Sequence, residues 1–343
     1  MLDYIIKNDI NIILQKLDPN VFEGKRALIT GGAGFIGSWL CDVLVKTGAR
    51  VTCLDNFSTG LNENIEHLLN KKGFNLIKQD VECLDDTVGR FDFILHLASR
   101  ASPEEHQQQP IETLKVNSLG SFRVIEQTLK SNATVLFTST SEVYGDAQLV
   151  PTPESYWGNV NPTGPRSGYD EGKRFAEALF TAHHREHGLD IRILRVFNSY
   201  GPRLRADGIY GRAISRFILQ SLQNQPLTVY GDGTQSRSFC YITDTVLGIL
   251  KALTNKRAKG EIFNIGNTHE IKILSLAKTI RKLTGSKSKI VFQPLPPEDP
   301  KRRCPDITKA KRLLNWQPEV PLEEGLNKTI QWFKPKLALE NGV

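Results

Sequence analysis

The chain has 343 residues, of which 39% are hydrophobic and 24% are charged. This composition is ordinary for a globular protein with one large domain, or with one domain that carries a smaller lobe. It includes no apolar run of the length, about 18 residues or more, that a transmembrane helix needs, so we expect no membrane span. The net charge of +7 is scattered, without a dense Lys/Arg tract interleaved with aromatic residues. We therefore expect no nucleic-acid partner, and an anionic small substrate fits the basic balance equally well.

The cysteines and the first residues of the chain bear on its location. The five cysteines are an odd number, and no CxxC pair occurs among them. Reduced thiols are the simplest interpretation, so we expect a cytoplasmic protein with neither a disulfide framework nor a metal site. Residues 1–24 carry apolar side chains near helical spacing, interrupted by charged ones. This pattern predicts a helical extension that packs on the main domain, not a signal peptide.

From Arg26 onwards, short apolar runs alternate with stretches of helical periodicity such as 35–48 and 113–130. The alternation predicts an α/β fold, a Rossmann-type doubly wound parallel sheet, in a domain that spans residues 25–200. Loops rich in Gly, Pro and Arg follow, and they predict a smaller C-terminal substrate-binding lobe at 201–335. The predicted strands are 26–30, 49–55, 74–80, 91–98, 133–140, 191–198 and a returning strand near 261–266.

A glycine motif marks a dinucleotide site. Gly31, Gly34 and Gly37 follow the first predicted strand and open a helix, in the segment TGGAGFIG. Glycines at such a turn let the backbone approach a pyrophosphate, which lies at the positive end of the helix. Asp55 ends the second strand, 18 residues beyond Gly37, and a carboxylate there favours NAD over NADP. Asp80 ends the third strand, where it is equally well a ligand of adenine or a polar strand terminus. We also place these neighbours in the cofactor site: Phe35, Ile36, Asn56, Val81, Leu97, Ala98 and Ser99.

A second constellation suits acid–base chemistry. Tyr169 and Lys173 are four residues apart in YDEGK, so on a helix they share one face. A nearby ammonium and the positive nicotinamide ring are expected to lower the pKa of the tyrosine, which then takes a proton from a sugar hydroxyl. Thr140 ends a predicted strand in TSTSEVYGD and can present its hydroxyl to the same substrate oxygen.

Several motifs together resemble one family. TGGAGFIG, HLAS, STSEVYGD, YDEGK, RVFNSYGPR and PLTVYGDGTQSR are similar to the extended short-chain dehydrogenases/reductases that modify nucleotide-sugars, from Lys25 to about Phe333. The resemblance implies a Rossmann domain, bound NAD, the triad Thr140, Tyr169 and Lys173, and a homodimer. It also implies contacts to the nucleotide-sugar from Asn198, Arg212 and Arg237, since guanidinium groups suit a diphosphate.

Within this family the chain most resembles the UDP-glucuronate decarboxylases. The similar segments are STSEVYGD, SYWGNVNPTGPRSGYDEGKR and DPKRRCPDI. Ser141 stands where dehydratases carry an aspartic acid, and a neutral hydroxyl is a poor proton donor to a leaving group. The resemblance implies oxidation at C4, loss of carbon dioxide and formation of UDP-xylose through a UDP-4-keto intermediate. It makes Glu142 an acid or base near C5 and Ser141 a substrate contact. Arg303 is then either a partner of the sugar carboxylate or a group that acts near C5. The segment HQQQP, residues 106–110, departs from the aromatic residues expected there.

Two other functions stay open. A UDP-sugar 4-epimerase, acting on UDP-glucuronate or on UDP-glucose and UDP-galactose, has the same triad but rotates the keto-sugar and does not release carbon dioxide. Epimerases do not require Glu142 with Ser141 and Arg303, so these residues favour the decarboxylase. A non-catalytic NAD-binding regulator is the third hypothesis, and the intact triad argues against it because a sensor needs only the cofactor loop.

Overall fold

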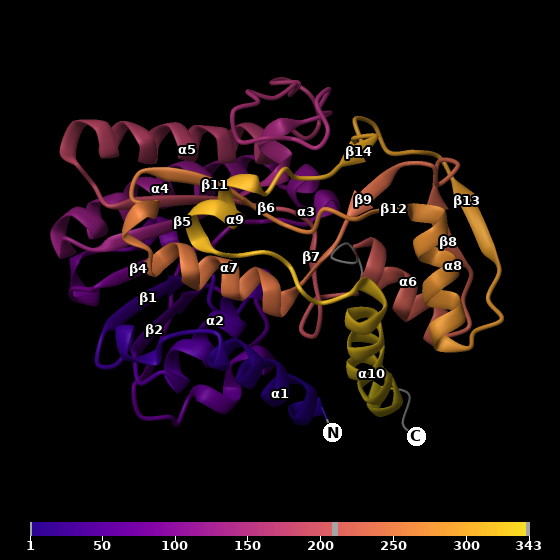
Figure 1. The fold of residues 1–343 in the computed structure, drawn as a ribbon, viewed down its shortest axis with the longest axis horizontal. Coiled ribbons are helices and arrows are strands. Elements are labelled where there is room, and N and C mark those ends of the chain that lie inside the picture. The colour runs from indigo at the N-terminus through magenta and orange to yellow at the C-terminus, as the bar shows by residue number, and fades with distance from the viewer. Residues whose placement is uncertain (1, 208–211, 341–343) are drawn as a thin grey trace.

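The computed structural model describes residues 2–207 and 212–340, which form two lobes of unequal size (Figure 1). The larger lobe is built on a seven-stranded sheet with the order β11-β6-β5-β4-β1-β2-β3. All of its pairings are parallel, so the predicted α/β fold of the Rossmann type is confirmed. The strands are β1 (Arg26–Thr30), β2 (Arg50–Asp55), β3 (Phe74–Lys78), β4 (Phe93–His96), β5 (Thr134–Thr140), β6 (Ile191–Val196) and β11 (Glu261–Ile265).

Alternate side chains of these strands enter two separate cores. In β1, Ile29 packs on one face of the sheet and Leu28 on the other. In β5, Leu136 and Phe137 divide in the same way. Because both faces are covered, the strands read as continuous apolar runs, as buried parallel strands do. One face is covered by α2 (Phe35–Lys46) and α7 (Ile242–Thr254), the other by α4 (Pro110–Ser131) and α5 (Ser167–His187).

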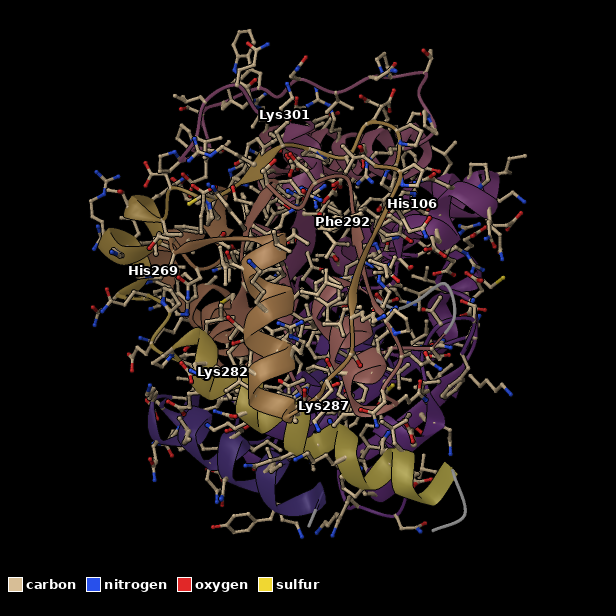
Figure 2. All side chains as sticks on the ribbon, turned by 90° about the vertical axis from the view of Figure 1, so that its right-hand side faces the viewer. His106, His269, Lys282, Lys287, Phe292 and Lys301 are labelled. Carbon is tan, nitrogen blue, oxygen red and sulfur yellow. The ribbon has the colours of Figure 1, made fainter. Side chains whose placement is uncertain are left out.

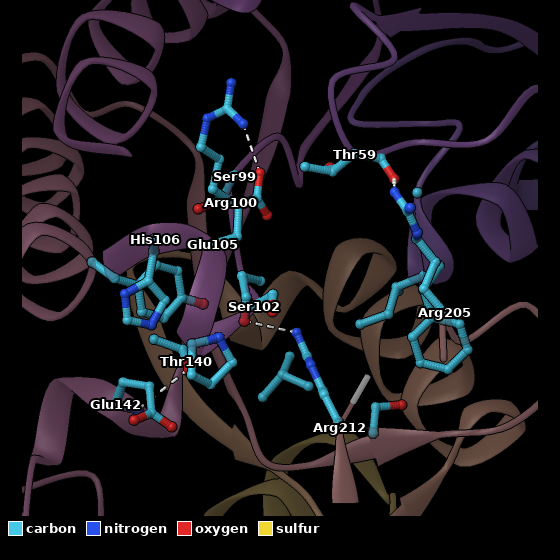
Figure 3. Close-up of a pocket in the computed structure, with 18 of the residues that line it drawn as sticks. Thr59, Ser99, Arg100, Ser102, Glu105, His106, Thr140, Glu142, Arg205 and Arg212 are labelled. Atoms are coloured by element: carbon cyan, nitrogen blue, oxygen red, sulfur yellow. Dashed lines mark hydrogen bonds and ion pairs between the residues drawn. The ribbon is translucent and has the colours of Figure 1, made fainter. Parts of the chain in front are cut away.

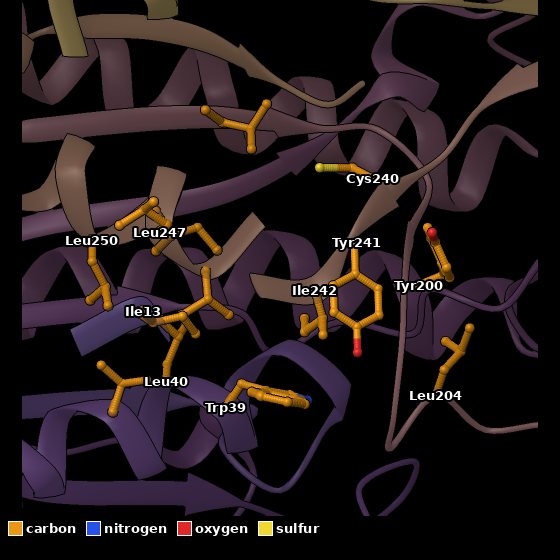
Figure 4. Packing of buried hydrophobic residues seen from close by; sticks show 14 of the residues in the cluster. Ile13, Trp39, Leu40, Tyr200, Leu204, Cys240, Tyr241, Ile242, Leu247 and Leu250 are labelled. Carbon is orange, nitrogen blue, oxygen red and sulfur yellow. The ribbon is translucent and has the colours of Figure 1, made fainter. Parts of the chain in front are cut away.

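The predicted N-terminal helix is α1 (Leu2–Gln15), which packs against α2, α7 and the last helix, α10 (Leu322–Glu340). Its residue Ile13 points into the core between Leu40 and Leu247 (Figure 4). The buried carboxylate of Asp9 accepts hydrogen bonds from the Tyr241 hydroxyl at 2.6 Å and from Lys328 at 3.0 Å. The extension is therefore an integral part of the fold.

The described part of the smaller lobe consists of short sheets and two helices, seen face-on in Figure 2. Strand β9 lies between β12 and β14, and β8 pairs with β13. These elements are α6 (Ala213–Leu222), β8 (Leu227–Tyr230), β9 (Ser236–Ser238), β12 (Glu270–Lys272), α8 (Ile273–Thr284), β13 (Ile290–Gln293) and β14 (Arg302–Arg303).

The two lobes are interleaved in sequence. The strand pair β7 (Ser199–Tyr200) and β10 (Cys240–Tyr241) lies where the chain leaves and re-enters the larger lobe. The returning strand near 261–266 is present as β11, and α7 and α9 (Thr308–Leu314) also return to the larger lobe. The carboxyl ends of the central strands face the smaller lobe, which is where open α/β sheets bind their ligands. No helix in the described ranges is long and apolar enough to cross a bilayer.

Candidate active site

One cavity of about 560 Å³ lies between the two lobes. It is lined by every residue that the sequence predicts for the cofactor, the substrate or the chemistry. These are Gly31, Gly34, Phe35, Ile36, Gly37, Asp55, Asn56, Asp80, Val81, Leu97, Ala98, Ser99, Thr140, Ser141, Glu142, Tyr169, Lys173, Asn198, Arg212, Arg237 and Arg303. The individual roles of these residues stay predictions.

The glycine loop suits a pyrophosphate. Gly31 has a φ of +71°, and a Cβ there would lie 2.8 Å from the backbone nitrogen of Ala98. A Cβ on Gly37 would collide with the carbonyl oxygen of Gly31, so the first turn of α2 packs directly on the loop. Helix α2 begins without a side-chain cap, which leaves its first N–H groups available to an anion. The loop therefore fits the dinucleotide that its sequence predicts.

Asp55 is the last residue of β2, but β3 ends at Lys78, so Asp80 lies two residues beyond the strand and does not end it as predicted. Both aspartates do more than the sequence predicts. Asp55 accepts backbone N–H bonds from Ala33 at 2.9 Å and Phe57 at 2.8 Å, so it also holds the glycine loop in place. Burial raises its pKa, and the carboxylate keeps lone pairs for ribose hydroxyls. Asp80 caps the 3-10 helix η4 (Val81–Cys83) and accepts a 2.7 Å bond from the Asn56 amide.

The predicted triad lies at the carboxyl end of β5 and on the first turns of α5. Burial raises the pKa of Tyr169 to about 12, against a hydrogen bond with Thr140 that lowers it. Burial also lowers the pKa of Lys173 to about 7, and the Lys173 amine donates to the Thr138 carbonyl oxygen at 3.0 Å. The expected lowering of the tyrosine pKa is therefore not a property of the protein alone. That expectation included the positive nicotinamide ring, which belongs to the cofactor.

Glu142 lies on the 3-10 helix η6 (Ser141–Tyr144) at the centre of a cluster of arginines. Arg303 donates to its carboxylate at 2.5 Å, and Arg166 forms a second ion pair with the same oxygen. Arg237 is the register partner of Arg303 across β9 and β14. Burial alone would raise the pKa of Glu142, but these arginines, Arg303 most of all, outweigh burial and lower the pKa to about 2. The carboxylate is therefore ionised at neutral pH.

The side chains that the resemblance assigns to the nucleotide-sugar are held by bonds to the protein. The Asn198 amide donates to the Ser238 carbonyl oxygen at 3.1 Å. Arg237 pairs with Asp299 at 2.9 Å. Arg212 donates to the Ala101 carbonyl oxygen at 2.9 Å and reaches into the cavity from the start of α6 (Figure 3).

Sequence reasoning missed Arg166 and the role of His106. Arg166 stands three residues before Tyr169 in a segment quoted for its resemblance, but nothing in its spacing marked it as a partner of Glu142. His106, on α3 (Pro103–Gln108), stacks on the Tyr169 ring with centroids 4.9 Å apart and planes 12° apart. Burial lowers its pKa to about 4, so a neutral imidazole occupies the place where an aromatic residue was expected. An ion pair of 2.6 Å between Arg100 and the buried Glu105 holds α3 beside the cavity (Figure 3).

Comparison with known proteins places this fold and site among the nucleotide-sugar enzymes. The chain belongs to the NAD dependent epimerase/dehydratase family, which residues 27–266 match. The family and the NAD cofactor predicted from the motifs are thus confirmed.

Two curated relatives are decarboxylases. The chain is 47% identical over 327 residues to UDP-glucuronic acid decarboxylase 1 of Xenopus tropicalis, covering 94% of this chain and 76% of the relative. It is 45% identical over 315 residues to UDP-glucuronic acid decarboxylase 5 of Arabidopsis thaliana, covering 92% and 91%. Both agree with the resemblance seen in the motifs.

Two solved structures similar to this fold are epimerases. The UDP-glucose 4-epimerase of Thermotoga maritima has a TM-score of 0.84 at 31% identity, over 91% of this chain and 99% of that one. The UDP-glucuronic acid 4-epimerase of Bacillus cereus, in complex with UDP-glucuronic acid and NAD, has a TM-score of 0.82 at 31% identity, over the same shares.

Proposed function

We propose that this protein converts UDP-glucuronate to UDP-xylose and carbon dioxide through a UDP-4-keto intermediate, with NAD as its cofactor. The observation that carries the proposal is the arginine cluster around Glu142, in the same cavity as Thr140 and Tyr169. Such a cluster suits a sugar that bears a carboxylate. The 43–47% identity to several UDP-glucuronic acid decarboxylases, over more than 90% of the chain, supports the same activity. The protein is an NAD-dependent nucleotide-sugar decarboxylase.

The residues of the cavity divide the chemistry between them. Bound NAD supplies a hydride acceptor for the sugar C4 and a positive charge that lowers the pKa of the nearby phenol. Tyr169 takes the proton of the C4 hydroxyl. Lys173, on the same face of α5, is held in place by the hydrogen bond from its amine to the Thr138 carbonyl oxygen. Oxidation makes the sugar a β-keto acid, so the C5–C6 bond breaks and its electron pair moves onto C5 and the C4 oxygen. Hydrogen bonds from Tyr169 and Thr140 would stabilise that enolate. A proton then adds at C5, and return of the hydride to C4 with the proton held by Tyr169 completes UDP-xylose.

Glu142 is an ionised carboxylate in this arrangement. With a pKa of about 2 it carries no proton to give at neutral pH. Its place between Arg303 and Arg166 lets it fix both guanidinium groups, which then face the sugar carboxylate. We assign substrate contacts to Arg303, Ser141, Asn198, Arg212 and Arg237.

The test is direct. The purified protein is incubated with UDP-glucuronate labelled with ¹³C in the sugar, and the sugar carbons are followed by NMR. The expected result is loss of the C6 signal as carbon dioxide, with UDP-xylose as product. Formation of UDP-galacturonate without carbon dioxide would replace the decarboxylase by the 4-epimerase, the activity named for the Bacillus cereus neighbour.

We also propose that the protein is a homodimer that pairs through α4 and α5. Apolar side chains stand exposed along both helices, among them Ile111, Leu114 and Phe122 on α4 and Phe175 on α5. The Phe122 and Phe175 rings meet with centroids 6.0 Å apart, so the patch is continuous between the helices.

All five cysteines are free, which supports a reducing compartment such as the cytoplasm. We assign NAD mainly to residues 25–200 and the UDP-sugar mainly to 201–335.

A further inference from the structure

The buried charges beside the catalytic centre include one carboxylate that the mechanism above does not use. Asp170 follows Tyr169 on α5, and its side chain is 6% exposed. Arg166 lies between it and Glu142, so that a single guanidinium serves two buried carboxylates. Arg303 and Arg237 complete the cluster on the far side of Glu142.

The two carboxylates are held unequally. Glu142 accepts a 2.5 Å bond from Arg303 in addition to its pair with Arg166. Among the described residues Asp170 has one contact with a charged partner, 3.6 Å from its Oδ2 to the Arg166 Nε, which is longer than a hydrogen bond. Within the described residues, its other oxygen, Oδ1, is buried without a hydrogen-bond partner. Asp170 does not line the cavity but lies behind Arg166, which does.

A sugar carboxylate that binds in this cavity adds a third anion to the same arginines. Arg303 and Arg166, which face the cavity, are then shared between three carboxylates, and an ionised carboxylate left without a partner in a buried site is strongly disfavoured. The group held most weakly is the one that gives up its charge. We propose that Asp170 takes up a proton when the carboxylate of the nucleotide-sugar binds, and so leaves Arg166 and Arg303 to the substrate. The inference rests on the proposed function, and the role of Asp170 is to position the arginines, not to touch the sugar.

Other groups around Asp170 agree with this assignment. Burial, followed by the Glu142 charge, raises the pKa of Asp170 to about 7, although Arg166 and Arg303 lower it. At neutral pH the Asp170 carboxyl of the free site is therefore partly protonated and partly ionised, and a small further rise in its pKa protonates it. His106 on α3 is neutral there, since burial lowers its pKa to about 4. The charged or titratable groups that face Asp170 are Tyr169 and Glu171 on its own helix, Arg166, Glu142 on η6 and Arg303 on β14.

The proton balance follows the reaction. A proton from solvent joins Asp170 as the carboxylate binds. When the C5–C6 bond breaks, neutral carbon dioxide leaves and the negative charge stays on C5 and the C4 oxygen as the enolate. A second proton from solvent then adds at C5 and removes that charge. Once UDP-xylose is formed, the cluster again holds only its own two carboxylates, and Asp170 returns its proton to solvent.

The test measures protons directly. The holoenzyme with Tyr169→Phe, which stops turnover, is titrated with UDP-glucuronate by calorimetry in two buffers of different ionisation enthalpy at pH 7.5. We expect an uptake of roughly half a proton or more per site, because a pKa near 7 moves upwards on binding. With Asp170→Asn added, the uptake falls to near zero, since an amide does not titrate. Glu171→Gln, one residue along and partly exposed, is the matched control and retains the uptake.

A second measurement separates this role from a structural one. Between pH 7 and 9 the dissociation constant of UDP-glucuronate should rise by up to about tenfold per pH unit, because binding consumes a proton. Asp170→Asn should remove this slope, and UDP-xylose, which lacks the carboxylate, should show neither slope nor uptake.

Each result decides. UDP-glucuronate that binds with no proton uptake, or with the same uptake and slope in Asp170→Asn, overturns the inference alone. Absence of UDP-glucuronate binding overturns the proposed function and the inference with it. Uptake without release of carbon dioxide by the wild type overturns the decarboxylase and supports the role of Asp170.

Discussion

Replacing Arg303 by alanine should remove most of the activity. Its guanidinium lies 2.5 Å from Glu142, is 12% exposed, and is the strongest of the charges that lower the Glu142 pKa. The substitution takes away a charge-assisted contact and leaves Arg166 as the one remaining direct ion-pair partner of Glu142 among the described residues. Loss of such a contact costs about 1.5–3 kcal/mol. That energy corresponds to a fall of roughly ten- to a hundred-fold in the rate of decarboxylation.

The neighbouring residue gives a matched control. Arg302 lies on the same short strand, but its side chain is 54% exposed and pairs with Glu270. Initial rates of UDP-xylose formation are measured for Arg303→Ala and Arg302→Ala, each checked for bound NAD to show that the fold is intact. We expect the loss in the first variant only. Equal rates in the two variants would refute the assignment of Arg303 to the substrate carboxylate.

Four further predictions follow from the site and the surface. Tyr169→Phe should abolish turnover while bound NAD, measured by absorbance after denaturation, stays at the wild-type level; measurable turnover would remove the phenol from the mechanism. Because Asp55 repels a 2′-phosphate, the purified protein should contain NAD and bind NADP more weakly in a competition titration, and equal binding would contradict this role. The pKa of Glu142 is lowered from 4.5 to about 2, so its ionised form stabilises the fold above the ordinary pKa and that contribution is lost as the pH falls through the folded value. The difference in urea unfolding free energy between wild type and Glu142→Gln should therefore shrink over this range, and a constant difference would count against the ion pairs. Phe122→Asp should produce a monomer in light scattering, and an unchanged mass would exclude the α4 patch from the interface.

The sheet was accessible from the sequence because each of its strands is an apolar run between helical periodicities. Leu28 packs in one core and Ile29 in the core on the opposite face of the sheet. Because both positions are buried, both are apolar, and the strand reads as an uninterrupted apolar run. The interleaving of the lobes was not accessible in the same way. The apolar periodicity of helix α7 would suit a helix in either lobe. Its packing on β5 and β6, which only the structure shows, places it in the larger lobe.

In the site, motifs identified residues but not their partners. The spacing of YDEGK predicted that Tyr169 and Lys173 share a helix face, since that depends on local geometry alone. The contact of Glu142 with Arg303 joins residues 161 positions apart, and the resemblance indicated both without indicating that they touch. The stacking of His106 on Tyr169 and the link from Arg166 to Asp170 also depend on tertiary packing, for which the sequence carries no periodic signal.

The interleaved lobes have a mechanical consequence. Within the described residues the chain crosses between them near 201–207, 239, 266–269 and 304–307, so four connections span the cleft instead of one hinge. A lobe tied at several points does not swing open by bending at a single linker, and any widening of the cleft must strain all four connections together. We therefore expect a large dinucleotide to exchange more slowly than the sugar. Because the reaction restores its own hydride acceptor in every cycle, the enzyme can work through many turnovers with the same molecule of NAD and depends on no external redox partner.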